Sequence, residues 1–294
     1  MNGNSVSEGP AIPLGKYQVK FYSCSISGQD WIGVREFVSR GKTYVLLIQP
    51  NNLQTQIAEL SCLKCTPISL EDLPESPYKR GLKEELSPPF PQVNDGLTHA
   101  KSDAGLFLTV DLCPSRQNFD ASIFENAKVK SREAFPVAVA LSGGWMNHFD
   151  TEFQWMKNQA LDHRLDIIWV NHSYTHPYKK GIKNKNNFLL TSGVHFDEEV
   201  LKQEQYMISR GILPSVFFRF PGLVSNQDLM IRLAHFGLIA LGTDAWLALG
   251  QKTKPGSIVL IHGNGNEEGG VHLFIKLLDT ISDMGVFKNL NLVL

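Results

Sequence analysis

The feature that most constrains the fold is a repeated alternation of apolar runs and amphipathic segments that begins at Gly105. The runs LFLTV (106–110), PVAVAL (136–141) and IIWV (167–170) are almost entirely apolar. Continuous apolar strands are typical of parallel sheets whose two faces are both covered by helices. The sequence therefore predicts an α/β domain with a largely parallel sheet.

About six strand–helix units are expected in this part of the chain, and that number favours a small (β/α) barrel over an open sheet. The expected strands are 106–110, 136–141, 167–170, 216–220, 238–241 and 257–261, and the expected helices are 119–130, 150–163, 197–210, 226–236 and 271–284.

The region before Gly105 has a different character. Runs such as YQVKFY (17–22) and TYVLLIQ (43–49) indicate strands. Six prolines between residues 66 and 103 predict an extended linker or a wrapping arm, because proline fixes φ and removes a backbone donor. We expect a strand-rich segment at 1–65, this linker at 66–103 and an α/β domain at 104–294. Trp31 and Tyr44 are either core aromatics or a sugar-binding surface.

Charge and cysteine content narrow the possible classes of protein. The net charge is -1, with 28 basic and 29 acidic residues, so no nucleic-acid partner is expected. No apolar run approaches the ~20 residues of a transmembrane segment. Residues 1–13 lack the pattern of an intact signal peptide. Cys62 and Cys65 form a CxxC, which we interpret as a structural disulfide or two inert thiols rather than a redox site.

Polar residues follow almost every expected strand. In parallel α/β folds the carboxyl ends of the strands meet at one rim, where the chemistry takes place. The residues expected at this rim are Asp111, Asn171, His172, His176, Arg219, Pro221, Gly222, Asp244, Trp246 and His262. Their shared position predicts an active site.

The residue types suggest separate roles. His172 and His176, spaced by four, lie on one face of a helical turn and suit a divalent ion such as zinc. His262 suits a general acid, because an ordinary imidazole pKa lies near neutrality. Asp111 is a candidate general base or metal ligand, or else a helix cap.

Two further charged residues have alternative interpretations. Arg219 either orients a carboxylate or forms a structural ion pair. Asp244 either holds His262 in one tautomer or caps a turn.

Five segments occur in the order and approximate spacing of the motifs of a known family: LFLTVDLCPS, VNHSYTHPY, FFRFPG, GTDAW and SIVLIH. With these motifs, residues 104–294 resemble the NodB-type polysaccharide deacetylases of carbohydrate esterase family four. The resemblance implies a distorted (β/α) barrel that hydrolyses N-acetyl groups of N-acetylglucosamine-containing glycans with the help of a divalent metal. It also implies an N-acetylated glycan as the partner and a location in the cell envelope.

The resemblance assigns the residues to roles. Asp111 is similar to the catalytic base, and Arg219 to the arginine that orients it. His172 and His176 are similar to the two histidine ligands. His262 resembles the general acid and Asp244 its supporting acid, whereas Trp246, with Pro221 and Gly222, resembles the substrate-binding wall.

One position departs from the family pattern. The first motif usually has two consecutive aspartates, the second a metal ligand, but this chain has Asp111-Leu112. Leucine cannot bind a metal, so the third protein ligand is missing. Asp111 could bind the metal and leave the base role vacant, another residue or water could fill the gap, or the site could be metal-free.

Other classes of function remain open. The altered motif is compatible with a glycan-binding, catalytically degenerate descendant or with a metal-independent amidase. A serine hydrolase is a more distant alternative, because ALSGG (140–144) approximates a nucleophile elbow around Ser142 without its first glycine.

Overall fold

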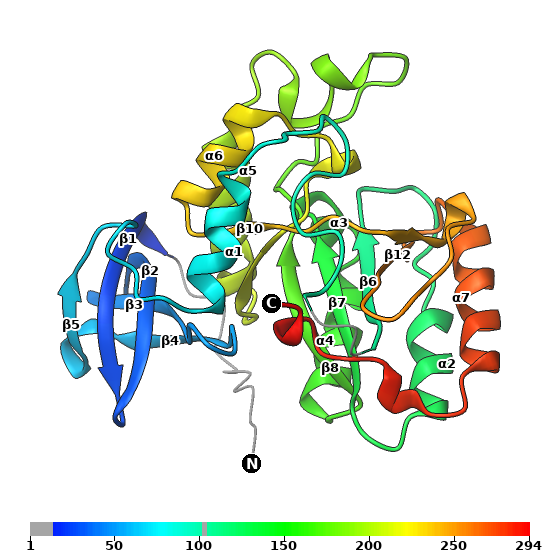
Figure 1. The fold of residues 1–294 in the computed structure, drawn as a ribbon, viewed down its shortest axis with the longest axis horizontal. Coiled ribbons are helices and arrows are strands. Elements are labelled where there is room, and N and C mark those ends of the chain that lie inside the picture. Colours follow the sequence, from blue (N-terminus) through cyan, green and yellow to red (C-terminus); the bar gives the residue numbers. More distant parts are fainter. Residues whose placement is uncertain (1–13, 102–104) are drawn as a thin grey trace.

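The computed structural model describes residues 14–101 and 105–294. The segment 1–13, which was expected to lack a signal peptide, lies outside the described residues, and so does the expected boundary at 103–104. Figure 1 shows a small sheet at one side, the larger α/β unit at the other, and helix α1 (Pro77–Glu85) between them.

The larger unit is built on a curled sheet of seven strands, which confirms the predicted barrel-type α/β fold. The strand order is β10-β9-β8-β7-β6-β12-β11, and every pair of neighbours runs parallel. The strands are β6 (Phe107–Leu112), β7 (Phe135–Leu141), β8 (Leu165–Asn171), β9 (Pro214–Phe218), β10 (Ile239–Ala240), β11 (Ala245–Trp246) and β12 (Ile258–His262). The sheet is a half-barrel, because β10 and β11 lie at its two edges.

Six helices follow these strands along the chain. Five of them lie within a few residues of the places the sequence predicts, whereas the short helix at 143–148 was not predicted. They are α2 (Ser122–Lys130), α3 (Gly143–His148), α4 (Asp150–Leu161), α5 (Phe196–Ser209), α6 (Gln227–His235) and α7 (Glu268–Thr280). One core joins the outer face of β6, β7 and β8 to α2, α4 and α7, and another joins β9 to α5 and α6.

Alternation along β6 decides which of its residues can reach the interior of the half-barrel. Leu108, Val110 and Leu112 belong to the core beneath α2 and α7, whereas Phe107 belongs to the interior core. Since side chains of a strand alternate between its faces, Thr109 and Asp111 share the interior side with Phe107.

The N-terminal segment forms an antiparallel sheet, as its strand-rich sequence predicts. Its strands are β1 (Gly15–Ile26), β2 (Gln29–Ser39), β3 (Lys42–Ile48), β4 (Thr55–Glu59) and β5 (Lys64–Pro67), in the order β4-β3-β2-β1-β5. Trp31 is buried in a core of this sheet, and Tyr44 stacks on Phe37 with ring centroids 5.8 Å apart. Both aromatics are therefore packing residues.

The proline-rich region is partly helical and partly an arm. Helix α1 begins with Pro77 after Ser76, whose side chain accepts a hydrogen bond from the Lys79 backbone N–H, and such a cap favours a helix start. The following arm forms bridges from Leu97 to Leu241 and from His99 to Ser257. The arm thus crosses the gap between β10 and β12.

The CxxC cysteines do not pair with each other. Cys65 on β5 lies directly opposite Cys24 on β1, and these two form the disulfide. Cys62 is an exposed free cysteine in the short turn Leu60–Cys62. Cys65 therefore forms a structural disulfide as expected, but its partner is Cys24 and not Cys62. The antiparallel pairing of β1 with β5 places Cys24 directly opposite Cys65.

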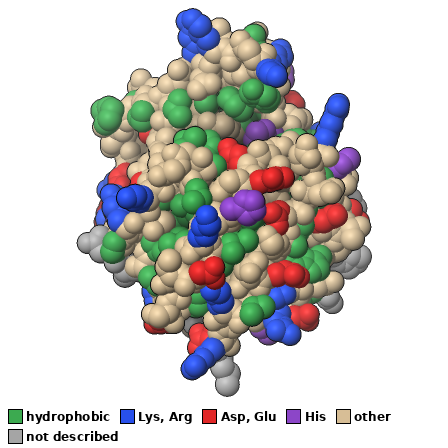
Figure 2. Space-filling model, turned by 90° about the vertical axis from the view of Figure 1, so that its right-hand side faces the viewer, with side chains coloured by type: hydrophobic (Ala, Val, Ile, Leu, Met, Phe, Trp, Pro, Cys, Tyr) green, Lys and Arg blue, Asp and Glu red, His purple; other side chains and the backbone are tan. Residues whose placement is uncertain are grey.

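On the side that carries α2 and α7, the surface of the described residues has no large patch of a single charge. Figure 2 shows basic, acidic and histidine side chains interspersed on this face. Among the described residues, none of the helices has the length and apolar character that a membrane crossing requires.

Candidate active site

Five of the predicted site residues come together at the carboxyl ends of the parallel strands. Asp111 lies near the end of β6, and His262 ends β12. His172 directly follows β8, and Arg219 directly follows β9. His176 completes the group through a ring contact with His172, at 4.6 Å between centroids.

The carboxylate of Asp111 is buried and faces a buried arginine. Its Oδ2 lies 3.9 Å from Nη1 of Arg219, whose Nη2 donates a hydrogen bond of 3.0 Å to Oγ1 of Thr109. Burial lowers the pKa of Arg219, and the Asp111 charge opposes that change. Asp111 Oδ1 is buried without a hydrogen-bond partner among the described residues, so this oxygen is free to accept a proton.

The two histidines approach each other through a loop. The expected helical turn at 172–176 is wrong: the backbone has positive φ at Ser173 (62°) and His176 (49°), which no α-helix contains. His172 Nδ1 lies 2.7 Å from the carbonyl oxygen of Arg219. A carbonyl can only accept, so Nδ1 carries the proton and Nε2 keeps its lone pair. Burial lowers the pKa of His172, which favours the neutral, metal-binding form.

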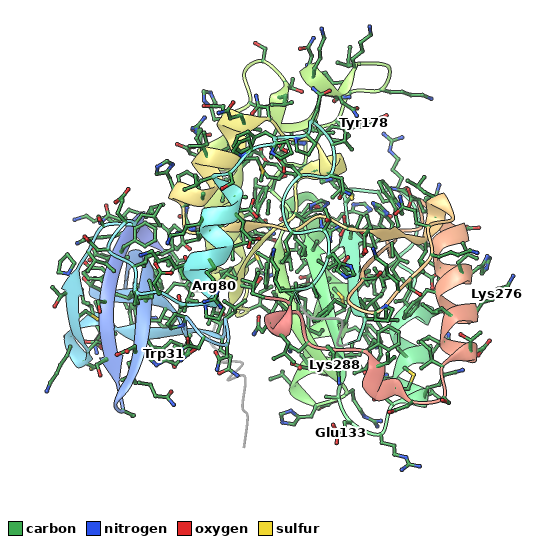
Figure 3. All side chains as sticks on the ribbon, viewed as in Figure 1. Trp31, Arg80, Glu133, Tyr178, Lys276 and Lys288 are labelled. Atoms are coloured by element: carbon green, nitrogen blue, oxygen red, sulfur yellow. A yellow bond between two sulfur atoms is a disulfide. The ribbon has the colours of Figure 1, made fainter. Side chains whose placement is uncertain are left out.

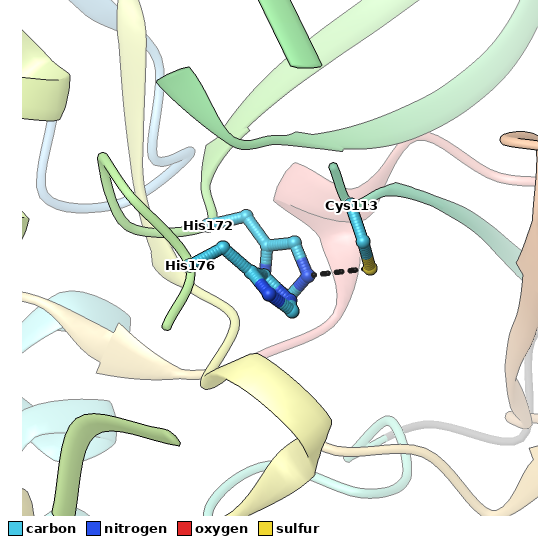
Figure 4. Close-up of side chains that lie close together, drawn as sticks. All are labelled: Cys113, His172 and His176. Atoms are coloured by element: carbon cyan, nitrogen blue, oxygen red, sulfur yellow. Dashed lines mark hydrogen bonds between the residues drawn. The ribbon is translucent and has the colours of Figure 1, made fainter. Parts of the chain in front are cut away.

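Cys113 belongs to the same site, although the sequence analysis did not single it out. Its Sγ lies 3.4 Å from Nε2 of His172, and Figure 4 shows the thiol beside both imidazoles. Burial alone raises the pKa of this thiol, but His176 and His262 lower it to about 7. The available signal was its place two residues after Asp111, on the same side of an extended chain.

The donor set fits a divalent metal. One donor atom each of Cys113, His172 and His176 lie within 4.8 Å of one another. His176 Nε2 is buried and has no hydrogen-bond partner among the described residues, which leaves it available as a metal donor. Thiolate and neutral imidazole are donors that zinc prefers.

His262 has an acidic partner that the sequence analysis missed. Its Nδ1 lies 2.8 Å from Oε2 of Glu267, and the same oxygen accepts a 2.9 Å hydrogen bond from Nε1 of Trp246. Burial lowers the pKa of His262, but Cys113 and Glu267 raise it, and the pKa ends well above its ordinary value. His262 is therefore suited to hold a proton until a leaving group needs it.

Asp244 does not support His262, contrary to the sequence-based prediction. Asp244 lies 2.7 Å from Nδ1 of His99 and accepts a hydrogen bond from the backbone N–H of Ile258. Ile258 begins β12 and His262 ends it, so about 13 Å of strand separates them. Asp244 directly precedes β11. It links His99 of the arm to the first residue of β12, whereas His262 is the last residue of that strand.

The remaining predicted wall residues lie at two places, Trp246 beside His262 and Gly222 against Phe188. The ring centroids of Trp246 and His262 lie 5.7 Å apart. Pro221 is buried, and Gly222 has φ 62°, where an added Cβ would lie 2.4 Å from the ring of Phe188. Phe188 in turn contacts Tyr178, which is 60% exposed and projects from the loop after β8 in Figure 3.

Ser142 is not placed as a nucleophile. Its hydroxyl is buried, donates to the Leu112 carbonyl and accepts from the Trp145 backbone N–H as the cap of α3. These bonds use the hydroxyl for structure, so the serine hydrolase interpretation has no support from this geometry.

Where His262 donates a proton in the reaction, we expect Glu267→Gln to reduce kcat about 10–100-fold, since a nearby opposite charge shifts a pKa by about 1–3 units. Without the carboxylate, the pKa of His262 falls, so the loss of activity with rising pH begins at lower pH. The pH–rate profile and the imidazole NMR titration measure this change. Glu268→Gln, at the exposed neighbouring carboxylate, is the matched control. An unchanged His262 titration would contradict the role of Glu267 in raising the pKa of His262.

Comparison with known proteins is informative at the level of fold. No family model matches the sequence. A family 4 carbohydrate esterase from Bacillus anthracis is 19% identical, covers 68% of this chain and 87% of its own, and has a TM-score of 0.50. A chitin deacetylase from Colletotrichum lindemuthianum is 12% identical over 67% of this chain and 89% of its own, with a TM-score of 0.45. A family 4 pseudoenzyme from Bacillus anthracis is 18% identical over 62% of each chain, with a TM-score of 0.41. The first of these similarities, together with the curled parallel sheet, shows that the chain has the fold of the family 4 carbohydrate esterases, the NodB-type deacetylases.

Proposed function

We propose that the protein is a hydrolase that removes N-acetyl groups from an N-acetylglucosamine-containing polysaccharide or cell-wall glycan. The observation that carries this proposal is the shared rim of a buried carboxylate, a histidine paired with an acid, and a thiol–imidazole donor group. Amide hydrolysis needs an activated water, a polarised carbonyl and a proton for a poor leaving group. The buried carboxylate suits the activation of water, the donor group suits a metal that polarises the carbonyl, and the histidine suits the supply of the proton.

The metal would be held by His172, His176 and a third donor. When bound, a zinc-like ion supplies Lewis-acid polarisation of the acetyl carbonyl and lowers the pKa of a water molecule. His172 is oriented for this role by its bond to the Arg219 carbonyl.

The protein's own groups then move the protons. Asp111 accepts a proton from the attacking water through its free Oδ1, while Arg219 holds the carboxylate in place. As the C–N bond breaks, His262 gives its proton to the nitrogen, and the products are acetate and a free amine. Trp246, with Pro221 and Gly222, is proposed as the wall of the acetyl-binding site.

A metal-independent amidase is a second candidate, favoured by one observation. Cys113, with a thiol pKa of about 7, stands near His262, which pairs with Glu267. Thiol, imidazole and carboxylate together can form an acyl-enzyme intermediate. Metal-stripped protein that still releases acetate, and that iodoacetamide inactivates at Cys113, would favour this route. A glycan-binding descendant predicts saturable sugar affinity with no acetate release.

The proposed function is tested by acetate release from N-acetylglucosamine oligomers with His262→Ala. We expect a loss of about 10²–10⁴-fold in kcat, because the amine leaving group loses its proton donor. Metal content, measured by mass spectrometry, should stay the same. His235→Ala, on the exposed surface of α6, is the control. Equal activity of His262→Ala would refute the general-acid assignment, and absence of acetate from the wild type would refute the function.

A further inference from the structure

We infer that Cys113 is the third protein ligand of a zinc-type metal site and replaces the missing carboxylate at position 112. The inference concerns the metal site of the proposed function. It has its own readout, because a metal can be held here whether or not the protein hydrolyses an amide.

The strand geometry explains why the side chain at position 112 cannot reach the metal site and the side chain at position 113 can. Leu112 is fully buried in the core beneath α2 and α7, on the far side of the sheet from the histidines. The next side chain along an extended backbone returns to the side of Asp111. Cys113 therefore presents its thiol to His172.

The distances agree with one small ion. Zinc–sulfur bonds of about 2.3 Å and zinc–nitrogen bonds of about 2.0–2.1 Å place sulfur and nitrogen roughly 3.6 Å apart in a tetrahedron. The observed separation of Cys113 Sγ and His172 Nε2 is 3.4 Å. All three donor atoms lie within 4.8 Å of one another, which is close enough for them to surround a single ion.

The surroundings leave these atoms available as donors. The bond from His172 Nδ1 to the Arg219 carbonyl directs Nε2 toward the thiol, which is the usual outer contact of a metal-bound imidazole. His176 Nε2 is buried without a partner among the described residues. A catalytic zinc site has three protein ligands and one open position, and these three residues supply that number.

The assignment also decides the role of Asp111. With Cys113 as the ligand, Asp111 is left for the role of base, since its Oδ2 lies 3.9 Å from Arg219 Nη1 and 3.8 Å from His172 Nε2. A thiolate with two imidazoles selects zinc or cobalt over magnesium and manganese, which prefer oxygen donors.

The test compares Cys113→Ser with Cys62→Ser in the full chain, purified without a histidine tag. Cys62 is the exposed free cysteine and is the matched control. We expect Cys113→Ser to weaken zinc binding by at least about 100-fold in a chelator competition, because even outer contacts contribute roughly 10–100-fold. Cobalt-loaded wild type and Cys62→Ser should show a near-ultraviolet sulfur-to-cobalt charge-transfer band, and Cys113→Ser should lack it.

A second variant guards against misfolding. Cys113→Asp restores an oxygen ligand and should bind zinc, whereas its cobalt-loaded form should lack the charge-transfer band. Circular dichroism reports on the fold of this variant. Equal zinc affinity in Cys113→Ser, or a missing band in the cobalt-loaded wild type, would overturn the inference. A thiolate band without acetate release would keep the inference and refute the proposed function. Metal-dependent acetate release that is unchanged in Cys113→Ser would support the proposed function and refute Cys113 as a ligand.

Discussion

Asp111→Asn is expected to lower acetate release about 10²–10⁴-fold while leaving the zinc content unchanged. The amide keeps the size of the side chain and its place beside Arg219, but it cannot accept a proton from water. With Cys113, His172 and His176 as the inferred metal donors, the loss should appear in kcat without a change in metal affinity. Steady-state kinetics with parallel metal analysis measure both quantities.

Asp244→Asn is the matched control for this substitution. Both acids lie in segments that resemble motifs of the deacetylase family. Asp244, however, pairs with His99 and accepts a hydrogen bond from the backbone N–H of Ile258, at the opposite end of β12 from His262. Its replacement should change stability and leave kcat within a few fold. If Asp111→Asn lost zinc together with activity, Asp111 would be a ligand and the base would have to be another group.

The second large effect concerns the junction of the N-terminal sheet with α5. Arg35 on β2 is fully buried and forms two hydrogen bonds to Glu204, which also accepts one from Tyr17. We expect Arg35→Met to lower the free energy of unfolding by about 3–5 kcal/mol, because it leaves the Glu204 carboxylate buried and unpaired. The midpoint of urea unfolding at constant slope measures this loss.

Two variants show whether the loss comes from the unpaired charge. The double variant Arg35→Met/Glu204→Met should recover most of the stability, since an apolar pair needs no counter-charge. Lys20→Met removes an ion pair with Glu36 whose lysine is 41% exposed, and should cost less than about 1 kcal/mol. If the double variant were no more stable than Arg35→Met, the loss would be one of packing rather than charge.

Much of the fold could be predicted because apolar runs mark buried parallel strands directly. The run PVAVAL became β7 and IIWV became β8, each within one or two residues of the expected bounds. Helix α1 was harder to predict, because the prolines of the surrounding region indicate extended chain. Its start depends on a local cap at Ser76 that outweighs the composition of the region.

The site was predicted in part for a related reason. Asp111 and His262 could be placed because they end long apolar strands. Asp244 was placed wrongly, because β10 and β11 have only two residues each and the sequence does not show where one ends and the other begins. Strand ends are a guide to a site only when the strand itself is unmistakable.

Cys113 and Glu267 were missed for different physical reasons. Cys113 is one residue beyond the motif position at which a ligand was expected, and only the alternation of side chains shows that it faces the histidines. Glu267 comes from the loop that follows β12, and the conformation of that loop brings it to His262. No periodic pattern in the sequence encodes a loop contact of this kind.

The central claim, a metal-assisted deacetylation, is tested most directly by titrating zinc into chelator-stripped full-length protein while acetate release from N-acetylglucosamine oligomers is measured. We expect little acetate release from the stripped protein. The rate should rise with added zinc and level off near one equivalent per chain, as expected for a single three-ligand site. Acetate release that is the same before and after zinc is added would contradict the central claim.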